Sequence, residues 1–195
     1  MRIQPSHLYF SLGASLLVIG GLFGSRAFAG KDPAVNPKVM QQQESFTVVG
    51  IAARTTNAKE MTADGVIGKF WARLFQEGLI AKIPNKADTN ILAVYTDYAI
   101  DHNGEYTYLL GAKVKNVANV PEGMVAKTVP AGKYAVFTSQ PGPAYQVVPQ
   151  IWQKINSLPK TATGGDRVYR ADFEVYDERA RDPQNTVVDV YVGIE

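Results

Sequence analysis

A single carboxylate and two tyrosines have the spacing of residues that could form one binding site. Glu174 and Tyr176 lie two residues apart in a strand-like run, residues 171–178, so the alternation of a strand places both on one face. Tyr95 occupies the position that matches Tyr176 in an earlier run, residues 91–97. Aromatic walls with one carboxylate suit a flat, apolar or cationic ligand, because the rings offer area and negative faces. The Glu174 carboxylate would orient or neutralise a positive group.

The same alternation predicts what else this face of the sheet carries. In the last strand-like run, residues 187–194, Tyr191 points away from the alternating valines, and we expect it beside Glu174. The apolar residues that alternate with these polar ones suit packing under helices; they are Leu92, Val94, Ala171, Phe173 and Val175. The face that carries Glu174 is therefore expected to be free of helices.

Each candidate also has a purely structural interpretation. Glu174 could be a solvated charge on a polar strand face, paired for example with Arg170. The two tyrosines at matching positions could be ordinary half-exposed strand residues, since tyrosine favours strands. Trp71 and Trp152 lie within helical apolar stripes, which is typical of core residues.

An internal repeat at a spacing of 81 residues organises the elements that must position these side chains. A helical pattern of apolar residues recurs at this spacing: Val66, Ile67, Phe70, Trp71 and Leu74, then Val147, Val148, Ile151, Trp152 and Ile155. A strand follows each helix, with Val94 matching Val175 and Tyr95 matching Tyr176. The recurrence of the whole pattern indicates a duplication.

The elements around each helix complete two similar halves. One strand precedes each helix, at residues 46–54 and 133–138, and two strands follow it, with turn residues between them at 103–104 and 182–183. Each half thus reads βαββ, with helices expected at 62–77 and 142–157. The predicted fold class is α+β: two βαββ repeats, about residues 45–117 and 118–195, form a mostly antiparallel sheet with both helices on one face.

The first part of the chain has the pattern of an export signal. Arg2 precedes a mostly apolar run at residues 8–23, and Ala27-Phe28-Ala29 offers a small-x-small cleavage site. We therefore predict a signal peptide over residues 1–29 and an exported protein, periplasmic or secreted. The alternative is an uncleaved membrane anchor formed by residues 8–23, although this run is shorter than the roughly 20 apolar residues of a spanning helix. Residues 30–44 are polar and are expected to be a tether.

Charge and composition argue against several classes of function. The chain of 195 residues has a net charge of +2, and Arg2 and Arg26 of the leader account for it. A neutral domain without a basic run lacks the electrostatic footprint of nucleic-acid binding. The chain has no Cys and only His102 outside the leader, so we expect no disulfide framework, no metal site and no cofactor.

The chain resembles the gyrase-inhibitor-like superfamily, whose small-molecule-binding domain is the effector-binding domain of AraC- and MerR-type regulators. The resemblance covers about residues 45–195, and the residues that carry it are 46–51, Trp71, 105–111, 130–137, Trp152 and 172–176. It implies two βαββ units about a pseudo-twofold axis with a ligand cleft between them. It also implies that Glu174 faces this cleft among aromatic side chains and serves lipophilic, cationic ligands. The expected ligand-binding residues are Glu174, Tyr176, Tyr95, Tyr191, Phe137 and Trp71.

The resemblance implies a small-molecule-binding protein. The chain is expected to differ from the regulators in two ways, because residues 1–44 give an export signal and a tether and contain no helix-turn-helix segment. Three other functions stay open. A hydrolase acting on reactive small molecules could use Glu174 as a general base, if burial raised its pKa. A haem protein would need an axial ligand, for which His102 and a few methionines are available. An envelope protein-interaction module could use the aromatic sheet face to bind a partner.

Overall fold

The computed structural model describes residues 39–159 and 162–195. The predicted signal peptide, residues 1–29, lies outside these residues, as does the predicted tether up to residue 38. Within the described residues, no helix is both long enough and apolar enough to cross a membrane.

One eight-stranded sheet forms the framework of the domain, and every pairing in it is antiparallel. Its order is β1-β6-β8-β7-β3-β4-β2-β5. The strands are β1 (Val39–Gln43), β2 (Phe46–Thr55), β3 (Ile91–Thr96), β4 (Tyr106–Val114), β5 (Val125–Val129), β6 (Gly132–Thr138), β7 (Arg167–Tyr176) and β8 (Asp189–Ile194). This order confirms the two predicted βαββ repeats: the strand order β2-β4-β3 recurs as β6-β8-β7, and the two sets meet at the β3–β7 pairing.

The strand that precedes each βαββ unit in the chain pairs with the other unit. β1 leads into β2 along the chain but pairs with β6, whereas β5 leads into β6 but pairs with β2. The tether predicted over residues 30–44 is therefore wrong at its end, since residues 39–43 form an edge strand of the sheet. Three consecutive glutamines in this strand show no alternation of polar and apolar residues, so the sequence carried no periodic signal for it.

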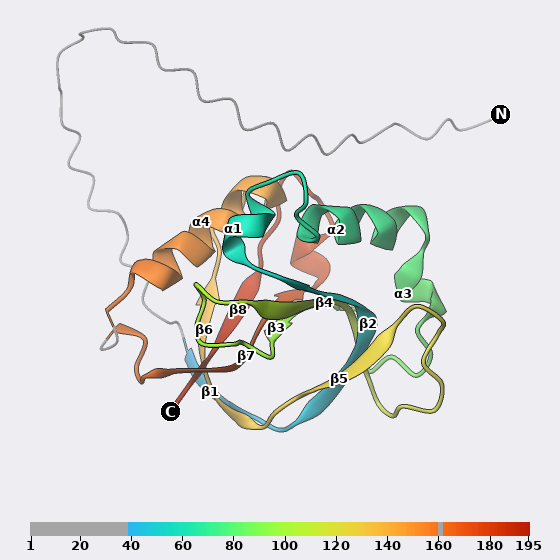
Figure 1. The fold of residues 1–195 in the computed structure, drawn as a ribbon, viewed down its shortest axis with the longest axis horizontal. Coiled ribbons are helices and arrows are strands. Elements are labelled where there is room, and N and C mark those ends of the chain that lie inside the picture. The colour runs from blue at the N-terminus through green and yellow to red at the C-terminus, as the bar shows by residue number, and fades with distance from the viewer. Residues whose placement is uncertain (1–38, 160–161) are drawn as a thin grey trace, which may run out of the picture. The chain divides into compact units, whose positions relative to one another are not determined.

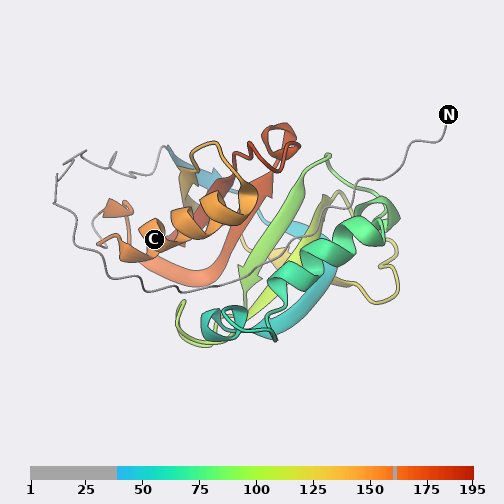
Figure 2. The ribbon, with the colours of Figure 1, turned by 90° about the horizontal axis from the view of Figure 1, so that it is seen from above.

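The helices lie on one face of the sheet, as predicted, with one long helix over each half (Figures 1 and 2). They are α1 (Asn57–Glu60), α2 (Ile67–Gln76), α3 (Leu79–Lys82) and α4 (Ala144–Ser157), and the short 3-10 helix η2 (Glu178–Ala180) follows β7. α2 packs against β3 and β4, and α4 packs against β6 and β8.

The start of α2 is held by a side chain from outside the helix. Val66, at the N-cap position, provides no side-chain cap. Instead the Glu60 carboxylate accepts hydrogen bonds from the backbone N–H groups of Val66 and Ile67, each at 3.0 Å, and from the Thr55 hydroxyl. A carboxylate is favoured there, because the first N–H groups of a helix have no partners within it and carry partial positive charge.

The prediction of which face lies under the helices is wrong. The side chains under α2 and α4 are the set that includes Ala93, Tyr95, Leu110 and Val190. The opposite face carries a second core built only from strands, with these members: Val48, Leu92, Val94, Leu109, Val129, Tyr134, Ala171 and Phe173, packed with Phe46, Ala52, Val175 and Tyr191.

Curvature of the sheet explains why both faces are buried. β1 and β5 curl below the sheet in Figure 1 and enclose the strand-only core. Gly50 and Gly111 face each other on β2 and β4, and a Cβ on either would meet backbone oxygen at 2.1 or 2.0 Å. Such close approach of two backbones, which only glycine permits, is typical of a bend in a sheet. Alternation therefore identified which residues share a face, but not which face the helices cover.

Candidate functional site

Glu174 lies at the centre of the sheet, on the face that the helices cover. Strand register places it in one row that crosses the sheet: Phe137, Val190, Glu174, Ala93, Leu110 and Ile51. All other members of this row are apolar. Glu174 is 1% exposed, so its carboxylate is buried between the sheet and the two long helices.

Three neutral donors surround the Glu174 carboxylate. Oε1 accepts hydrogen bonds from the Tyr95 hydroxyl at 2.8 Å and from the Trp152 indole Nε1 at 2.5 Å. Oε2 accepts one hydrogen bond, from the Tyr176 hydroxyl at 2.7 Å. No Lys or Arg in the described part of the chain forms an ion pair with Glu174. The carboxylate is thus solvated by protein dipoles without a counter-charge.

Burial dominates the acid–base properties of this cluster. It raises the pKa of Glu174, and the hydrogen bonds from Trp152, Tyr176 and Tyr95 oppose that rise only in part. Burial and the nearby Glu174 charge raise the pKa of Tyr95 and of Tyr176 well above the usual value. Both tyrosines therefore remain protonated and continue to donate to the carboxylate at neutral pH.

The aromatic walls pair across the two halves. Trp71 on α2 contacts Tyr176 on β7, with ring centroids 4.7 Å apart, and Trp152 on α4 contacts Tyr95 on β3 at 5.0 Å. Both pairs are edge-on. Because each tryptophan and each tyrosine match at the same spacing of 81 residues, the two contacts are related by the duplication. The interpretation of Trp71 and Trp152 as plain core residues misses this arrangement.

The two aromatic pairs are related by the duplication, but the polar groups beside them are not. Ala93 occupies the position in the first half that matches Glu174, so only one carboxylate stands between the two aromatic pairs. Trp152 donates to that carboxylate, whereas Trp71 makes no hydrogen bond to it and lies beside the Tyr108 hydroxyl instead. Trp71 also stacks on Phe75, which is 64% exposed.

Glu174 and the aromatic side chains around it, Tyr95, Tyr176, Trp71 and Trp152, form a cage. Tyr108 on β4 adds a buried hydroxyl to its first-half side. Its ring contacts that of Tyr95 at 5.3 Å and that of Phe70 at 6.1 Å. Burial and then the Glu174 charge raise the pKa of Tyr108, and the Trp71 side chain lies close enough to oppose this slightly. The hydroxyl nevertheless makes no hydrogen bond with any described residue.

A second carboxylate, Asp172, is buried two residues before Glu174 on the same face of β7. It is 0% exposed, and its Oδ2 accepts hydrogen bonds from Arg167 at 2.7 Å and from Tyr98 at 2.9 Å. Its Oδ1 accepts from the backbone N–H of Gly193 at 2.9 Å. An irregularity in the β7–β8 pairing, in which Tyr169 has a φ of 50°, brings Arg167 back toward Asp172.

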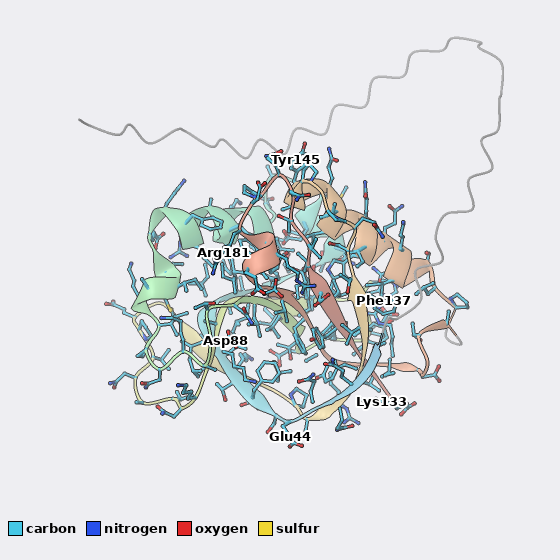
Figure 3. All side chains as sticks on the ribbon, turned by 180° about the vertical axis from the view of Figure 1, so that it is seen from behind. Glu44, Asp88, Lys133, Phe137, Tyr145 and Arg181 are labelled. Atoms are coloured by element: carbon cyan, nitrogen blue, oxygen red, sulfur yellow. The ribbon has the colours of Figure 1, made fainter. Side chains whose placement is uncertain are left out.

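The structure brings together four of the six predicted site residues and separates two. Glu174, Tyr95, Tyr176 and Trp71 lie together in the cage. Phe137, labelled in Figure 3, is on the same face but 0% exposed in the core under α4, with Val190 between it and Glu174 in the register. The predicted position of Tyr191 is wrong: it lies on the opposite face, stacked on Phe173 at 4.5 Å.

The sequence reasoning also missed residues that complete the site. Trp152 was assigned to the core, although its match to Trp71 was a signal that both tryptophans could flank one cleft. Tyr106 and Tyr108 share one face of β4, and this alternation is the signal that could have placed them beside Tyr95. Asp172 shares the face of Glu174 by alternation, but its pairing with Arg167 depends on the irregular register of β7, which no periodic pattern encodes.

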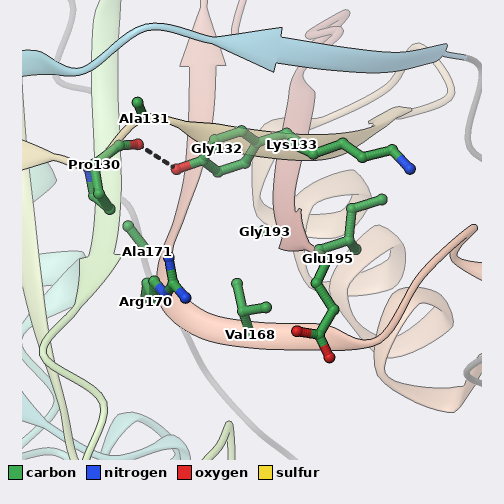
Figure 4. Close-up of a pocket in the computed structure, with 11 residues that line it drawn as sticks. Pro130, Ala131, Gly132, Lys133, Val168, Arg170, Ala171, Gly193 and Glu195 are labelled. Atoms are coloured by element: carbon green, nitrogen blue, oxygen red, sulfur yellow. Dashed lines mark hydrogen bonds between the residues drawn. The ribbon is translucent and has the colours of Figure 1, made fainter.

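Two other hollows of the domain lie away from this cage. A cavity of about 60 Å³ is lined by residues of 130–134, 168–171 and 193–195; there the Tyr134 hydroxyl donates to the carbonyl of Pro130 at 3.1 Å (Figure 4). A wider hollow of about 740 Å³ runs along residues 42–47 and 113–117. Glu174 lines neither of them, because the aromatic side chains close over it.

The residues considered for haem or metal binding are placed elsewhere. His102 lies in the β3–β4 turn, where its Nδ1 is 3.0 Å from the Tyr169 hydroxyl and its ring stacks on Tyr169. Within the described ranges, no group of three or more His, Cys, Asp or Glu side chains is arranged to hold a metal ion.

Comparisons with known proteins match this fold over almost all of the described residues. The family of the integron-associated effector binding protein, Cass2, matches residues 40–194. YobU of Bacillus subtilis (strain 168), a proposed transcriptional regulator, is 34% identical over 147 residues, which cover 75% of this chain and 90% of YobU. The transcriptional regulator BrlR of Pseudomonas aeruginosa is 38% identical over 130 residues, which cover 66% of this chain and 46% of BrlR.

Solved structures show the same arrangement of strands and helices. An integron cassette protein from the mobile metagenome of Vibrio cholerae is 25% identical with a TM-score of 0.63, over 80% of this chain and 95% of that chain. SAV2435, solved with tetraphenylphosphonium, is 24% identical with a TM-score of 0.65, over 80% of this chain and 93% of that chain. These matches confirm the resemblance to effector-binding domains that the sequence predicted.

Proposed function

This chain belongs to the family of integron-associated effector-binding proteins, and from that premise we propose that it binds lipophilic or aromatic cations at Glu174. The ligand would lie between the two aromatic pairs, with its positive charge against the carboxylate. The single observation that carries the proposal is the buried Glu174 carboxylate, which has three neutral donors and no cationic partner among the described residues.

The energetics of burial support a cationic ligand. An ionised carboxylate that leaves water without a counter-charge loses several kcal/mol even after hydrogen bonding. Hydrogen bonds from Tyr95, Tyr176 and Trp152 offset part of this cost, and the raised pKa of Glu174 reflects the remainder. A bound cation would offset that remainder, so the same feature that destabilises the free carboxylate favours the complex.

The aromatic rings support a lipophilic ligand. Tryptophan and tyrosine faces attract cations by about 0.5 to 2 kcal/mol each and add apolar contact area. SAV2435, which shares the fold, was solved with tetraphenylphosphonium, an aromatic cation that has no hydrogen-bond donor. We infer that this chain accepts ligands of the same broad class.

Ligand entry requires the cage to open on the side of Trp71. Trp152 is fixed by its hydrogen bond to Glu174, whereas Trp71 has no such bond and stacks on the exposed ring of Phe75. A rotation of Trp71 with Phe75 would therefore uncover Oε2 of Glu174 at the lowest cost in hydrogen bonds. The approach from the α4 side would break the bond between Trp152 and the carboxylate.

A thermal-shift screen of the full chain tests the proposal. Wild type and Glu174→Gln are heated with tetraphenylphosphonium, rhodamine 6G, naphthalene and a porphyrin, each in excess. A ligand that binds the folded state stabilises it by about 2.7 kcal/mol at one hundred times its dissociation constant. We expect both cations to stabilise the wild type and to have no effect on Glu174→Gln. Stabilisation by neutral naphthalene alone, or equal shifts in both proteins, would refute a carboxylate-centred cation site.

Export is a separate part of the proposal. It is supported by the sequence pattern of residues 1–29, which lies outside the described residues. Cleavage after Ala29 would give a mature protein that begins at Gly30. Mass spectrometry of the protein recovered from a periplasmic extract of an expressing Gram-negative host tests this; an intact Met1 terminus in the cytoplasmic fraction would contradict it.

A further inference from the structure

Unused hydrogen-bonding capacity in the cage lies on one side of Glu174. A carboxylate oxygen can accept about two hydrogen bonds. Oε1 already accepts two, from Tyr95 and Trp152, but Oε2 accepts only the one from Tyr176. One acceptor position of Oε2 is therefore open to a donor from outside the described residues.

A second buried group with open acceptor positions lies near the Glu174 carboxylate. The Tyr108 hydroxyl is buried without a hydrogen-bond partner among residues 39–159 and 162–195, and the residue is 0% exposed. Its ring contacts Tyr95, which donates to Oε1, and Trp71 beside its hydroxyl contacts Tyr176, which donates to Oε2. Leaving a buried polar group unpaired costs about 1 to 3 kcal/mol, so a hydroxyl kept in this state points to a ligand that satisfies it.

Resting on the proposed function, we propose that the preferred ligands are protonated lipophilic amines, whose ammonium N–H groups hydrogen-bond Oε2 of Glu174 and the Tyr108 hydroxyl oxygen. An ammonium group supplies both the positive charge that Glu174 lacks and donors for the two open acceptors. A quaternary ammonium or phosphonium ion supplies the charge alone. The site then discriminates between cations by their N–H groups, and Tyr108 is a specificity-determining residue.

The strength of a charged hydrogen bond sets the expected affinity ratio between cations with and without an N–H group. A hydrogen bond to a charged group contributes about 1.5 to 3 kcal/mol, which corresponds to roughly ten- to hundredfold in affinity. Sites built to hydrogen-bond a ligand group reject analogues without it, because the polar groups of the site remain unpaired. Methylation of the ammonium nitrogen removes the donor and keeps the charge, so it isolates this contribution.

Calorimetry with a matched pair of cations tests the inference. The probes are 1-naphthylmethylammonium, which has three N–H groups, and 1-naphthylmethyl-trimethylammonium, which has none. Each is titrated into the full wild-type chain, Tyr108→Phe and the control Tyr191→Phe, in which the same hydroxyl is removed from the opposite face of the sheet. We expect the wild type and Tyr191→Phe to bind the N–H cation about tenfold more tightly or better. In Tyr108→Phe we expect this ratio to fall severalfold toward one.

The unfolding temperature of Tyr108→Phe provides an independent readout. Removing an unpaired hydroxyl should leave it unchanged or raise it, whereas a lower value would show that the hydroxyl has a structural partner and would overturn the inference. Equal binding of both cations by wild type, or an unchanged ratio in Tyr108→Phe, would overturn it while the proposed function stands. Absence of binding by both cations would overturn the proposed function as well.

Discussion

Asp172 and Glu174 lie two residues apart on the same face of β7, and both are buried, yet their surroundings differ in one respect. Asp172 has a cation, Arg167, together with the Tyr98 hydroxyl and a backbone N–H. Among the residues that the structure describes, Glu174 has only neutral donors. The protein thus neutralises one buried carboxylate internally and leaves the other without a counter-charge.

This difference separates a structural role from a ligand-binding role. The Asp172 network joins β7 to β8 through Gly193 and to α4 through Arg167 and Asn156. It also reaches Tyr98 of the first half. Glu174 joins Tyr95 of the first half to Trp152 and Tyr176 of the second. The first half has Ile91 and Ala93 at the matching positions, so both carboxylates belong to one copy of the duplicated unit.

The largest effect is expected when the paired carboxylate is removed. Asp172→Ala leaves Arg167, whose side chain is 10% exposed, without its counter-charge and leaves the Gly193 N–H without an acceptor. Breaking a buried ion pair in this way costs about 3 to 5 kcal/mol. We expect the free energy of unfolding in urea to fall by that amount in Asp172→Ala, and to change by less than about 1 kcal/mol in Glu174→Gln, which keeps an acceptor and loses an unpaired charge.

A double variant controls for general disruption of the core. Adding Arg167→Met to Asp172→Ala removes the uncompensated guanidinium, so part of the lost stability should return. Equal losses in Asp172→Ala and Glu174→Gln would show that the two carboxylates do not differ in the way described.

Effects of intermediate size on the free energy of unfolding are expected when either tryptophan is replaced. Trp152→Phe removes a donor to an ionised, buried oxygen, and we expect a loss of about 1.5 to 3 kcal/mol. Trp71→Phe removes no hydrogen bond to the ionised Glu174, so we expect a smaller loss, of less than about 1.5 kcal/mol, mainly from contact area. Urea unfolding of both variants measures the difference, and a greater loss in Trp71→Phe would contradict the assignment of Trp71 as the movable wall.

Much of the fold could be predicted because its signals are periodic. The spacing of 81 residues identified both helices, the strand pairs and the match of Tyr95 with Tyr176. The face under the helices could not be identified, because the curled sheet buries Phe173 on one side and Glu174 on the other. Tyr191 was misplaced for that reason, and the strand at 39–43 was missed because its residues are mostly glutamine. The Asp172–Arg167 pairing depends on an irregular register near Tyr169.

The smallest effect is expected in the pH dependence of stability. The folded state raises the pKa of Glu174, so between the unfolded pKa, about 4.3, and the folded pKa it binds more protons than the unfolded state. The contribution of Glu174 to the free energy of unfolding is therefore full below the unfolded pKa and is lost as pH rises through the folded pKa. Urea titrations at a series of pH values should show a shallower decline in Glu174→Gln than in wild type; parallel curves would rule out this contribution.

The most direct test of the central claim is the pKa of the Glu174 carboxyl itself, with and without a cation. Wild-type protein labelled with 13C at the glutamate side-chain carboxyl is titrated by NMR, with Glu174→Gln used to assign the signal. We predict a pKa above the usual glutamate value in the free protein and a clear fall when tetraphenylphosphonium is added, because the cation stabilises the charged form. An ordinary pKa in the free protein, or a raised pKa that the bound cation leaves unchanged, would contradict the claim that Glu174 is an uncompensated charge that binds cations.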